Sequence, residues 1–130
     1  MLKFHHVGLV VKSIKVALPS YERIFGAEAI SKVFDIYSQN VRVCFVEVGP
    51  GSFIELVEPG IENSQINGLL KKGITYYHIG YVTSTFQESI DYLKREGFKE
   101  ISVFKSEAFQ GKSCAFMVNR NAHLFELIEV

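Results

Sequence analysis

The chain contains the same pattern twice, and this internal repeat limits its possible folds more than any other feature. The segment HVGLVV at 6–11 resembles HIGYVT at 78–83, at a spacing of 72 residues. FIELVE at 53–58 resembles LFELIE at 124–129, at a spacing of 71 residues. A repeat of this length indicates two similar structural modules rather than one continuous architecture.

Modules of about 60 residues bury little surface and would be only marginally stable on their own. We therefore expect a single domain over residues 1–130, in which a first module at about 1–60 packs against a second module at about 75–130. The linker between them, at about 61–74, is expected to contain a short helix at 64–71.

Each module shows the same order of elements: a strand, a helix and then three strands. Apolar runs rich in β-branched residues predict strands, and a Ser-led segment with apolar residues at helical spacing follows the first strand of each module. Pro19 falls inside the first helix, and Gly26 and Gly97 stand where the two helices are expected to end. GPG at 49–51 predicts a hairpin turn. Strands are expected at 4–11, 41–48, 53–58, 76–83, 112–118 and 123–129.

Two histidines and two glutamates repeat within these apolar strands: His6 and His78 in the first strand of each module, Glu55 and Glu126 in the last. One such residue alone is more often a satisfied structural group than a ligand. Two buried carboxylates facing each other repel, however, and a divalent cation would neutralise both. Two neutral imidazoles complete a ligand set that suits Zn, Mn, Co, Ni or Fe. The repeat therefore predicts a divalent metal site.

His5 has no histidine counterpart, because Tyr77 occupies the corresponding position of the second module. Strand alternation puts His6 and Gly8 on one face and His5 on the other. We therefore expect a structural role for His5. Gly8 removes a side chain from the face of His6 and is expected to leave room beside the ion.

Composition narrows the classes of partner. The 14 Lys and Arg residues balance 14 Asp and Glu residues without a basic patch, so we expect no nucleic-acid or membrane partner and favour a small molecule. The chain shows neither a secretory signal nor an apolar run of about 18 residues, and we expect a cytoplasmic protein. Cys44 and Cys114 lie in apolar runs and are expected to be buried reduced thiols.

The motifs HVG and HIG in the first strands, with IEL and FEL in the last, resemble those of the vicinal oxygen chelate superfamily, which includes glyoxalase I and methylmalonyl-CoA epimerase. The resemblance implies an α+β fold whose two tandem βαβββ modules form an open, incomplete β-barrel around a metal. It also implies that His6, Glu55, His78 and Glu126 hold the metal, that the metal chelates vicinal oxygens of the substrate, and that the protein is a homodimer.

Within the superfamily, the stretch at 54–73 is similar to the epimerase pattern of an acidic strand, a proline and a Ser-led helix. The stretch FQGKSCAFMVNRNAH at 109–123 departs from that pattern and shares only Gly111 and Lys112 with it. This departure weakens the case for an acyl-CoA as the carbonyl substrate. It leaves the expected fold and metal site unaffected.

The chemistry expected of such a site is abstraction of a proton next to a carbonyl group, because a bound metal stabilises the resulting oxyanion. Glu126 is the first choice of base and Glu55 the second. The best match is a metal-dependent isomerase or lyase like methylmalonyl-CoA epimerase. The alternatives are a lactoylglutathione lyase like glyoxalase I and a non-catalytic binding protein of the bleomycin-resistance type. A ring-cleaving dioxygenase and a metal that serves folding alone are further possibilities.

Overall fold

The computed structural model describes residues 2–60 and 64–130. Their strands are β1 (Lys3–Val10), β2 (Ile30–Ile36), β3 (Val41–Gly49), β4 (Ser52–Pro59), β5 (Tyr76–Thr83), β6 (Lys99–Ser106), β7 (Lys112–Val118) and β8 (Leu124–Glu129). The α-helices are α1 (Ile14–Phe25), α2 (Asn67–Lys71) and α3 (Phe86–Arg95), and short 3-10 helices are η1 (Ala27–Ala29), η2 (Tyr37–Gln39) and η3 (Glu107–Phe109).

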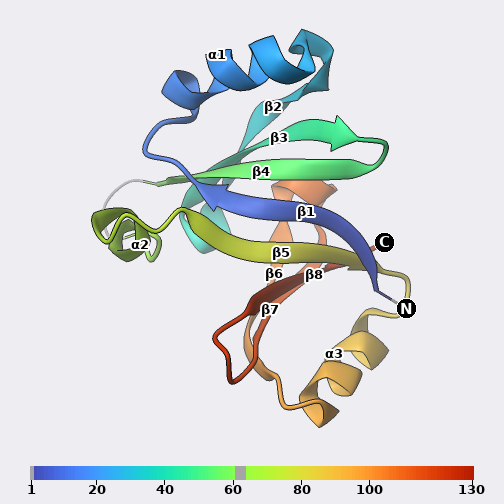
Figure 1. Cartoon of the computed structure of the whole chain (residues 1–130). Coiled ribbons are helices and arrows are strands. Elements are labelled where there is room, and N and C mark those ends of the chain that lie inside the picture. Colours follow the sequence, from blue (N-terminus) through green and yellow to red (C-terminus); the bar gives the residue numbers. More distant parts are fainter. Residues whose placement is uncertain (1, 61–63) are drawn as a thin grey trace.

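All eight strands belong to one curled sheet, in the order β2-β3-β4-β1-β5-β8-β7-β6 (Figure 1). Within each module the first strand pairs with the last in parallel, β1 with β4 and β5 with β8. The two first strands, β1 and β5, pair antiparallel in the middle and join the modules. The predicted α+β fold, with two βαβββ modules in an open half-barrel, is confirmed.

The six strands predicted with residue ranges are present. The structure also gives the bounds of two strands, β2 and β6, that the apolar runs did not locate. β2 and β6 are the first of the three strands that follow the helix in each module, and they form the two edges of the sheet. Their sequences, ISKVFDI and KEISVFKS, mix charged and apolar residues. A strand paired on one side only has no need of a continuous apolar run, which explains why these bounds could not be read from the sequence.

The predicted helix after the first strand of each module is also present. α1 begins after Ser13, whose Oγ accepts a hydrogen bond from the Val16 amide at 3.3 Å, and it continues through Pro19. Gly26 follows α1 with a φ of 96°, and Gly97 follows α3 with a φ of 93°, values that favour glycine. In the predicted linker, residues 61–63 lie outside the described residues, and α2 falls within the predicted helix at 64–71.

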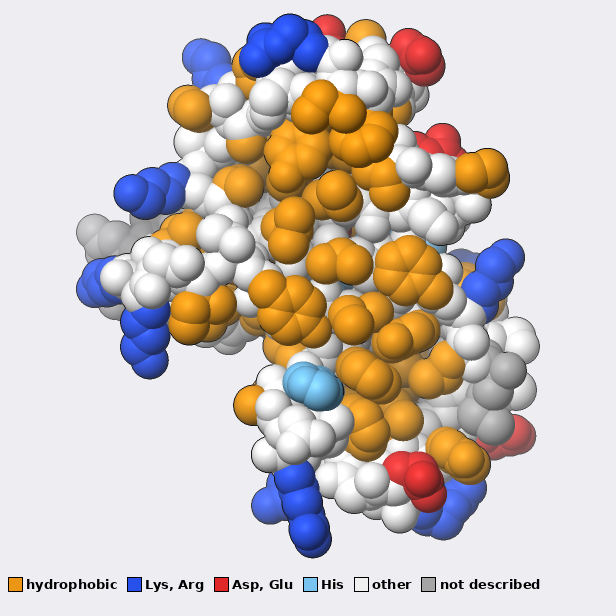
Figure 2. Space-filling model, viewed as in Figure 1, with side chains coloured by type: hydrophobic (Ala, Val, Ile, Leu, Met, Phe, Trp, Pro, Cys, Tyr) orange, Lys and Arg blue, Asp and Glu red, His pale blue; other side chains and the backbone are white. Residues whose placement is uncertain are grey.

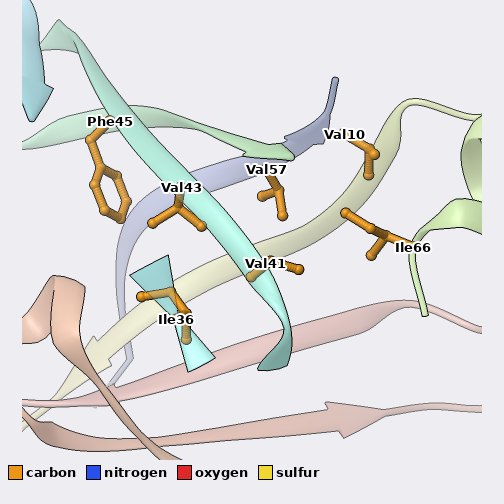
Figure 3. Close-up of a cluster of buried hydrophobic side chains, with 7 residues drawn as sticks. All are labelled: Val10, Ile36, Val41, Val43, Phe45, Val57 and Ile66. Carbon is orange, nitrogen blue, oxygen red and sulfur yellow. The ribbon is translucent and has the colours of Figure 1, made fainter. Parts of the chain in front are cut away.

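Alternation along the strands creates an inner and an outer apolar layer. On β3, Cys44 and Val46 pack under α1 on the outside, whereas Val43 and Phe45 face the inside of the curl. Figure 3 shows the inner cluster of Val10, Ile36, Val41, Val43, Phe45, Val57 and Ile66, whose side chains converge from the strands and from the segment before α2. Cys44 and Cys114 are buried and free, as predicted, and burial raises the pKa of both thiols.

The surface in Figure 2 is apolar at its centre. Hydrophobic side chains gather over β4, β1 and β5, between α1 and α3, while Lys and Arg side chains stand around the periphery. Phe4 on β1 and Tyr76 on β5 are more than two-fifths exposed. Over the ranges 2–60 and 64–130, none of the helices has the length and apolar character needed to cross a bilayer.

Candidate metal centre

The four repeated polar residues meet inside the curl of the sheet. His6 comes from β1, Glu55 from β4, His78 from β5 and Glu126 from β8, which are the four central strands. One nitrogen or oxygen atom of each residue lies within 4.8 Å of those of the other three. All four residues are at most 5% exposed. The structure therefore brings together every metal ligand that the sequence predicts.

The register of the central strands explains this convergence. His6 lies opposite Gly80 across the β1–β5 pair, and Gly8 lies opposite His78. A Cβ on Gly8 would stand 2.5 Å from Cε1 of His78, and a Cβ on Gly80 would overlap the His6 ring. The expectation that Gly8 leaves room beside an ion was wrong, because the opposing imidazole fills that room. Each glycine lets the other module's histidine reach the centre.

Gly80→Ala is therefore expected to push the His6 ring away from the other ligands. Overpacking of this kind costs about 1–3 kcal/mol of stability, and the displaced imidazole should lower the metal content of the purified protein. Elemental analysis and thermal unfolding measure the two effects. Gly68→Ala, in α2, is the control because no atom lies within 4 Å of the added Cβ. Equal metal content in both variants would contradict the packing argument.

The distances between the ligand atoms suit one cation. Nε2 of His6 and Nε2 of His78 are 2.9 Å apart. Oε1 of Glu126 lies 3.1 and 3.2 Å from these two nitrogens, and Oε1 of Glu55 lies 3.4 and 3.1 Å from them. Ligands bound about 2.0–2.2 Å from a divalent metal stand about 3–3.5 Å from one another at right or tetrahedral angles. The donor set fits such an ion.

Electrostatics favour a cation at the same point. Burial lowers the pKa of His6, but the charge of Glu55 and close contacts with both carboxylates raise it to about 10. The pKa of His78 is raised by the same carboxylates against its burial. Burial raises the pKa of each carboxyl, yet the histidines hold both pKa values below the ordinary one. The two carboxylates thus favour positive charge at the centre, carried either by protons on the histidines or by a bound cation.

Protons are a poor source of that charge. Two protonated Nε2 atoms cannot face each other at 2.9 Å, so the His6–His78 contact accommodates one proton between the rings. Glu126 Oε1 makes no hydrogen bond to any described residue despite its proximity to both nitrogens. A divalent cation satisfies all four donors without a proton.

His5 departs from its predicted position. The register between β1 and β5 shifts between Phe4 and His6, so His5 is the extra residue of a β-bulge. Its Nδ1 lies 2.9 Å from Nδ1 of His6, and its ring packs among phenylalanines on the inner side of the sheet. The prediction that His5 faces away from His6 was wrong, because strand alternation fails at a bulge. Burial and the charge of His6 lower the pKa of His5 to about 4.

A narrow cavity of about 20 Å³ borders Glu55, His78 and Glu126, and it is otherwise walled mostly by apolar side chains. An outer hollow of about 640 Å³ shares Gln39, Tyr77 and Phe116 with it. The two spaces are therefore neighbours, separated by these three shared residues.

Two hydrogen bonds link Gln65, which lines the outer hollow, to Gln39 and Tyr77, which line both spaces. Gln65 Nε2 donates to Gln39 Oε1 at 3.2 Å and to the Tyr77 hydroxyl at 3.4 Å. No sequence pattern pointed to the two glutamines, which lie in a 3-10 helix and in an irregular segment. For Tyr77 a signal existed, since it is the counterpart of His5 in the repeat.

Comparisons with known proteins found relatives in both sequence and fold. The sequence model of the Glyoxalase/Bleomycin resistance protein/Dioxygenase superfamily matches residues 5–116. The uncharacterized protein YqjC of Bacillus subtilis (strain 168) is 31% identical over 132 residues, covering 99% of this chain and 93% of that protein.

Two solved structures share the fold. Methylmalonyl-CoA epimerase from Mycobacterium tuberculosis has a TM-score of 0.84 at 23% identity, covering 97% of this chain and 86% of that one. A methylmalonyl-CoA epimerase in complex with methylmalonyl-CoA has a TM-score of 0.75 at 19% identity, covering 99% and 94%. At these identities the likeness concerns the fold alone.

Proposed function

The chain belongs to the Glyoxalase/Bleomycin resistance protein/Dioxygenase superfamily, and from this premise we propose that it is a metal-dependent enzyme that abstracts a proton next to a carbonyl group. The observation that carries the proposal is the buried convergence of His6, Glu55, His78 and Glu126. These residues would hold one divalent ion of Zn, Co, Mn, Ni or Fe. When bound, the ion supplies Lewis-acid stabilisation of the negative charge that develops on the carbonyl oxygen.

The carboxylates would move the proton. Glu126 and Glu55 both line the inner cavity, where an ionised carboxylate can accept a proton from a bound substrate. We assign Glu126 as the first candidate base and Glu55 as the second. Two bases that work on opposite faces of a planar carbanion produce epimerisation. One base that returns the proton to a neighbouring carbon produces isomerisation of the glyoxalase kind.

The favoured reaction is that of a methylmalonyl-CoA epimerase. Its support is the resemblance of residues 54–73 to epimerases, together with a shared fold whose solved examples include a complex with methylmalonyl-CoA. The polar side chains of Gln39, Gln65 and Tyr77 offer hydrogen bonds to the arm of a thioester. A lactoylglutathione lyase would use the same proton abstraction and is the second candidate, because a single carboxylate beside the ion is sufficient for it.

A hydrogen-exchange experiment separates these functions. The metal-loaded protein is incubated in deuterium oxide with methylmalonyl-CoA and, separately, with the hemithioacetal of methylglyoxal and glutathione. Metal-dependent deuterium uptake into the thioester, followed by mass spectrometry and NMR, is the expected result. Conversion of the hemithioacetal would identify the lyase instead. If neither compound exchanges and a small molecule binds unchanged, the binding-protein alternative replaces the enzyme.

Two further parts of the proposal come from the resemblance and the composition: a homodimeric assembly and a cytoplasmic location. Light scattering of the purified protein measures the first, with twice the chain mass as the expected result. Fractionation of cells that express the protein measures the second. Neither result affects the assignment of the site.

A further inference from the structure

His5 touches the four-residue cluster, yet the proposed mechanism gives it no task. Its Nδ1 lies 2.9 Å from Nδ1 of His6. The other nitrogen of His6, Nε2, points the opposite way, to His78 and the two carboxylates. His6 therefore stands between the cluster on one side and His5 on the other.

A hydrogen bond between two Nδ1 atoms needs one donor and one acceptor, and the cluster decides which is which. A nitrogen that binds a metal carries no proton, so a neutral His6 that ligates through Nε2 has its proton on Nδ1. His6 Nδ1–H then donates and His5 Nδ1 accepts. We propose that His5 is a positioning residue that holds His6 in the tautomer and orientation required for metal binding, an inference that rests on the proposed function.

The surroundings of His5 make it a fixed acceptor. Its ring stacks on Phe53, with centroids 4.8 Å apart and planes 28° from parallel. Phe45 and Phe109 meet it edge to face, at 5.9 and 5.4 Å. The bulge turns the side chain to the inner side of the sheet, and the three rings limit its rotation. An outer partner of a metal ligand is effective when its own rotamer is held in this way.

The second module lacks this arrangement. Tyr77 is the counterpart of His5 and is likewise the extra residue of a bulge, but its hydroxyl contacts Gln65. Among the described residues, nothing hydrogen-bonds Nδ1 of His78. The two halves of the centre are therefore unequal, and only His6 has an outer partner from its own strand. Removal of the Tyr77 hydroxyl should not affect the metal.

His5→Phe tests the proposal because it keeps an aromatic ring among the three phenylalanines and removes the acceptor. Loss of an outer partner typically weakens metal binding about 10- to 100-fold. We expect that loss in zinc affinity, measured by competition with a chromogenic chelator. His5→Asn restores an acceptor oxygen near the place of Nδ1 and should recover most of the affinity. Tyr77→Phe, the matched control, should bind zinc like the wild type.

Two measurements distinguish positioning from packing. Thermal unfolding of the metal-free protein should be similar for wild type and His5→Phe, because the packing is kept. Long-range ¹H–¹⁵N NMR of the zinc-loaded wild type should show the proton on Nδ1 of His6 and on Nε2 of His5. A proton on Nδ1 of His5, or wild-type zinc affinity in His5→Phe, overturns the inference alone. If the wild type binds no divalent metal, the proposed function fails and the inference fails with it.

Discussion

His78→Ala is expected to remove the divalent metal from a protein that otherwise carries about one ion per chain, and to destabilise the fold. His78 is 1% exposed and contributes one of the four converging donor atoms. Its loss leaves Glu55 and Glu126 buried near each other with less positive charge between them. Removal of one partner from a buried charged set costs about 3–5 kcal/mol. Elemental analysis measures the metal, and chemical denaturation measures the free energy of unfolding.

His6→Ala should behave in the same way, because the repeat gives the two histidines equivalent places. His123→Ala is the matched control: His123 is exposed and lies outside the cluster, so metal content and stability should remain at the wild-type level. If His6→Ala and His78→Ala also retain their metal and stability, the site described above does not bind a metal.

Glu126→Gln is expected to lower the rate of solvent exchange into the substrate by about 100-fold or more while the metal stays bound. The amide oxygen can still act as a ligand, but the amide cannot accept a proton as the carboxylate does, and general-base catalysis contributes about 10² to 10⁴ in rate. Deuterium uptake into methylmalonyl-CoA measures the exchange, and elemental analysis of the same sample measures the metal.

Glu55→Gln makes the comparison quantitative, since Glu55 occupies the equivalent place in the first module. A smaller loss there would assign Glu126 as the principal base, and equal losses would support two bases. Glu129→Gln, a change in the same strand outside the cluster, is the control and should exchange like the wild type. Undiminished exchange in Glu126→Gln would transfer the role of base to Glu55 or to another group.

The repeat made much of this protein readable from its sequence. An element order that occurs twice predicts two similar modules, and apolar periodicity locates most of the strands and both long helices because it reflects burial along each segment. The same doubling singled out His6, Glu55, His78 and Glu126. Buried charged groups are costly, so their recurrence at matching places indicates a shared purpose.

The features of the site that the sequence did not predict depend on tertiary contacts. The side chain of His5 points to the inner side of the sheet because of a bulge in the pairing of β1 with β5. These strands are far apart in the sequence, so the residue pattern within β1 could not predict the bulge. The role of Gly80 depends likewise on the His6 ring that lies across from it. Gln39 and Gln65 are 26 residues apart in the sequence, and only the folded chain brings their side chains into a hydrogen bond. The local pattern of apolar residues predicts which face of a strand is buried. Which side chains from other strands contact that face is decided only when the two modules pack together.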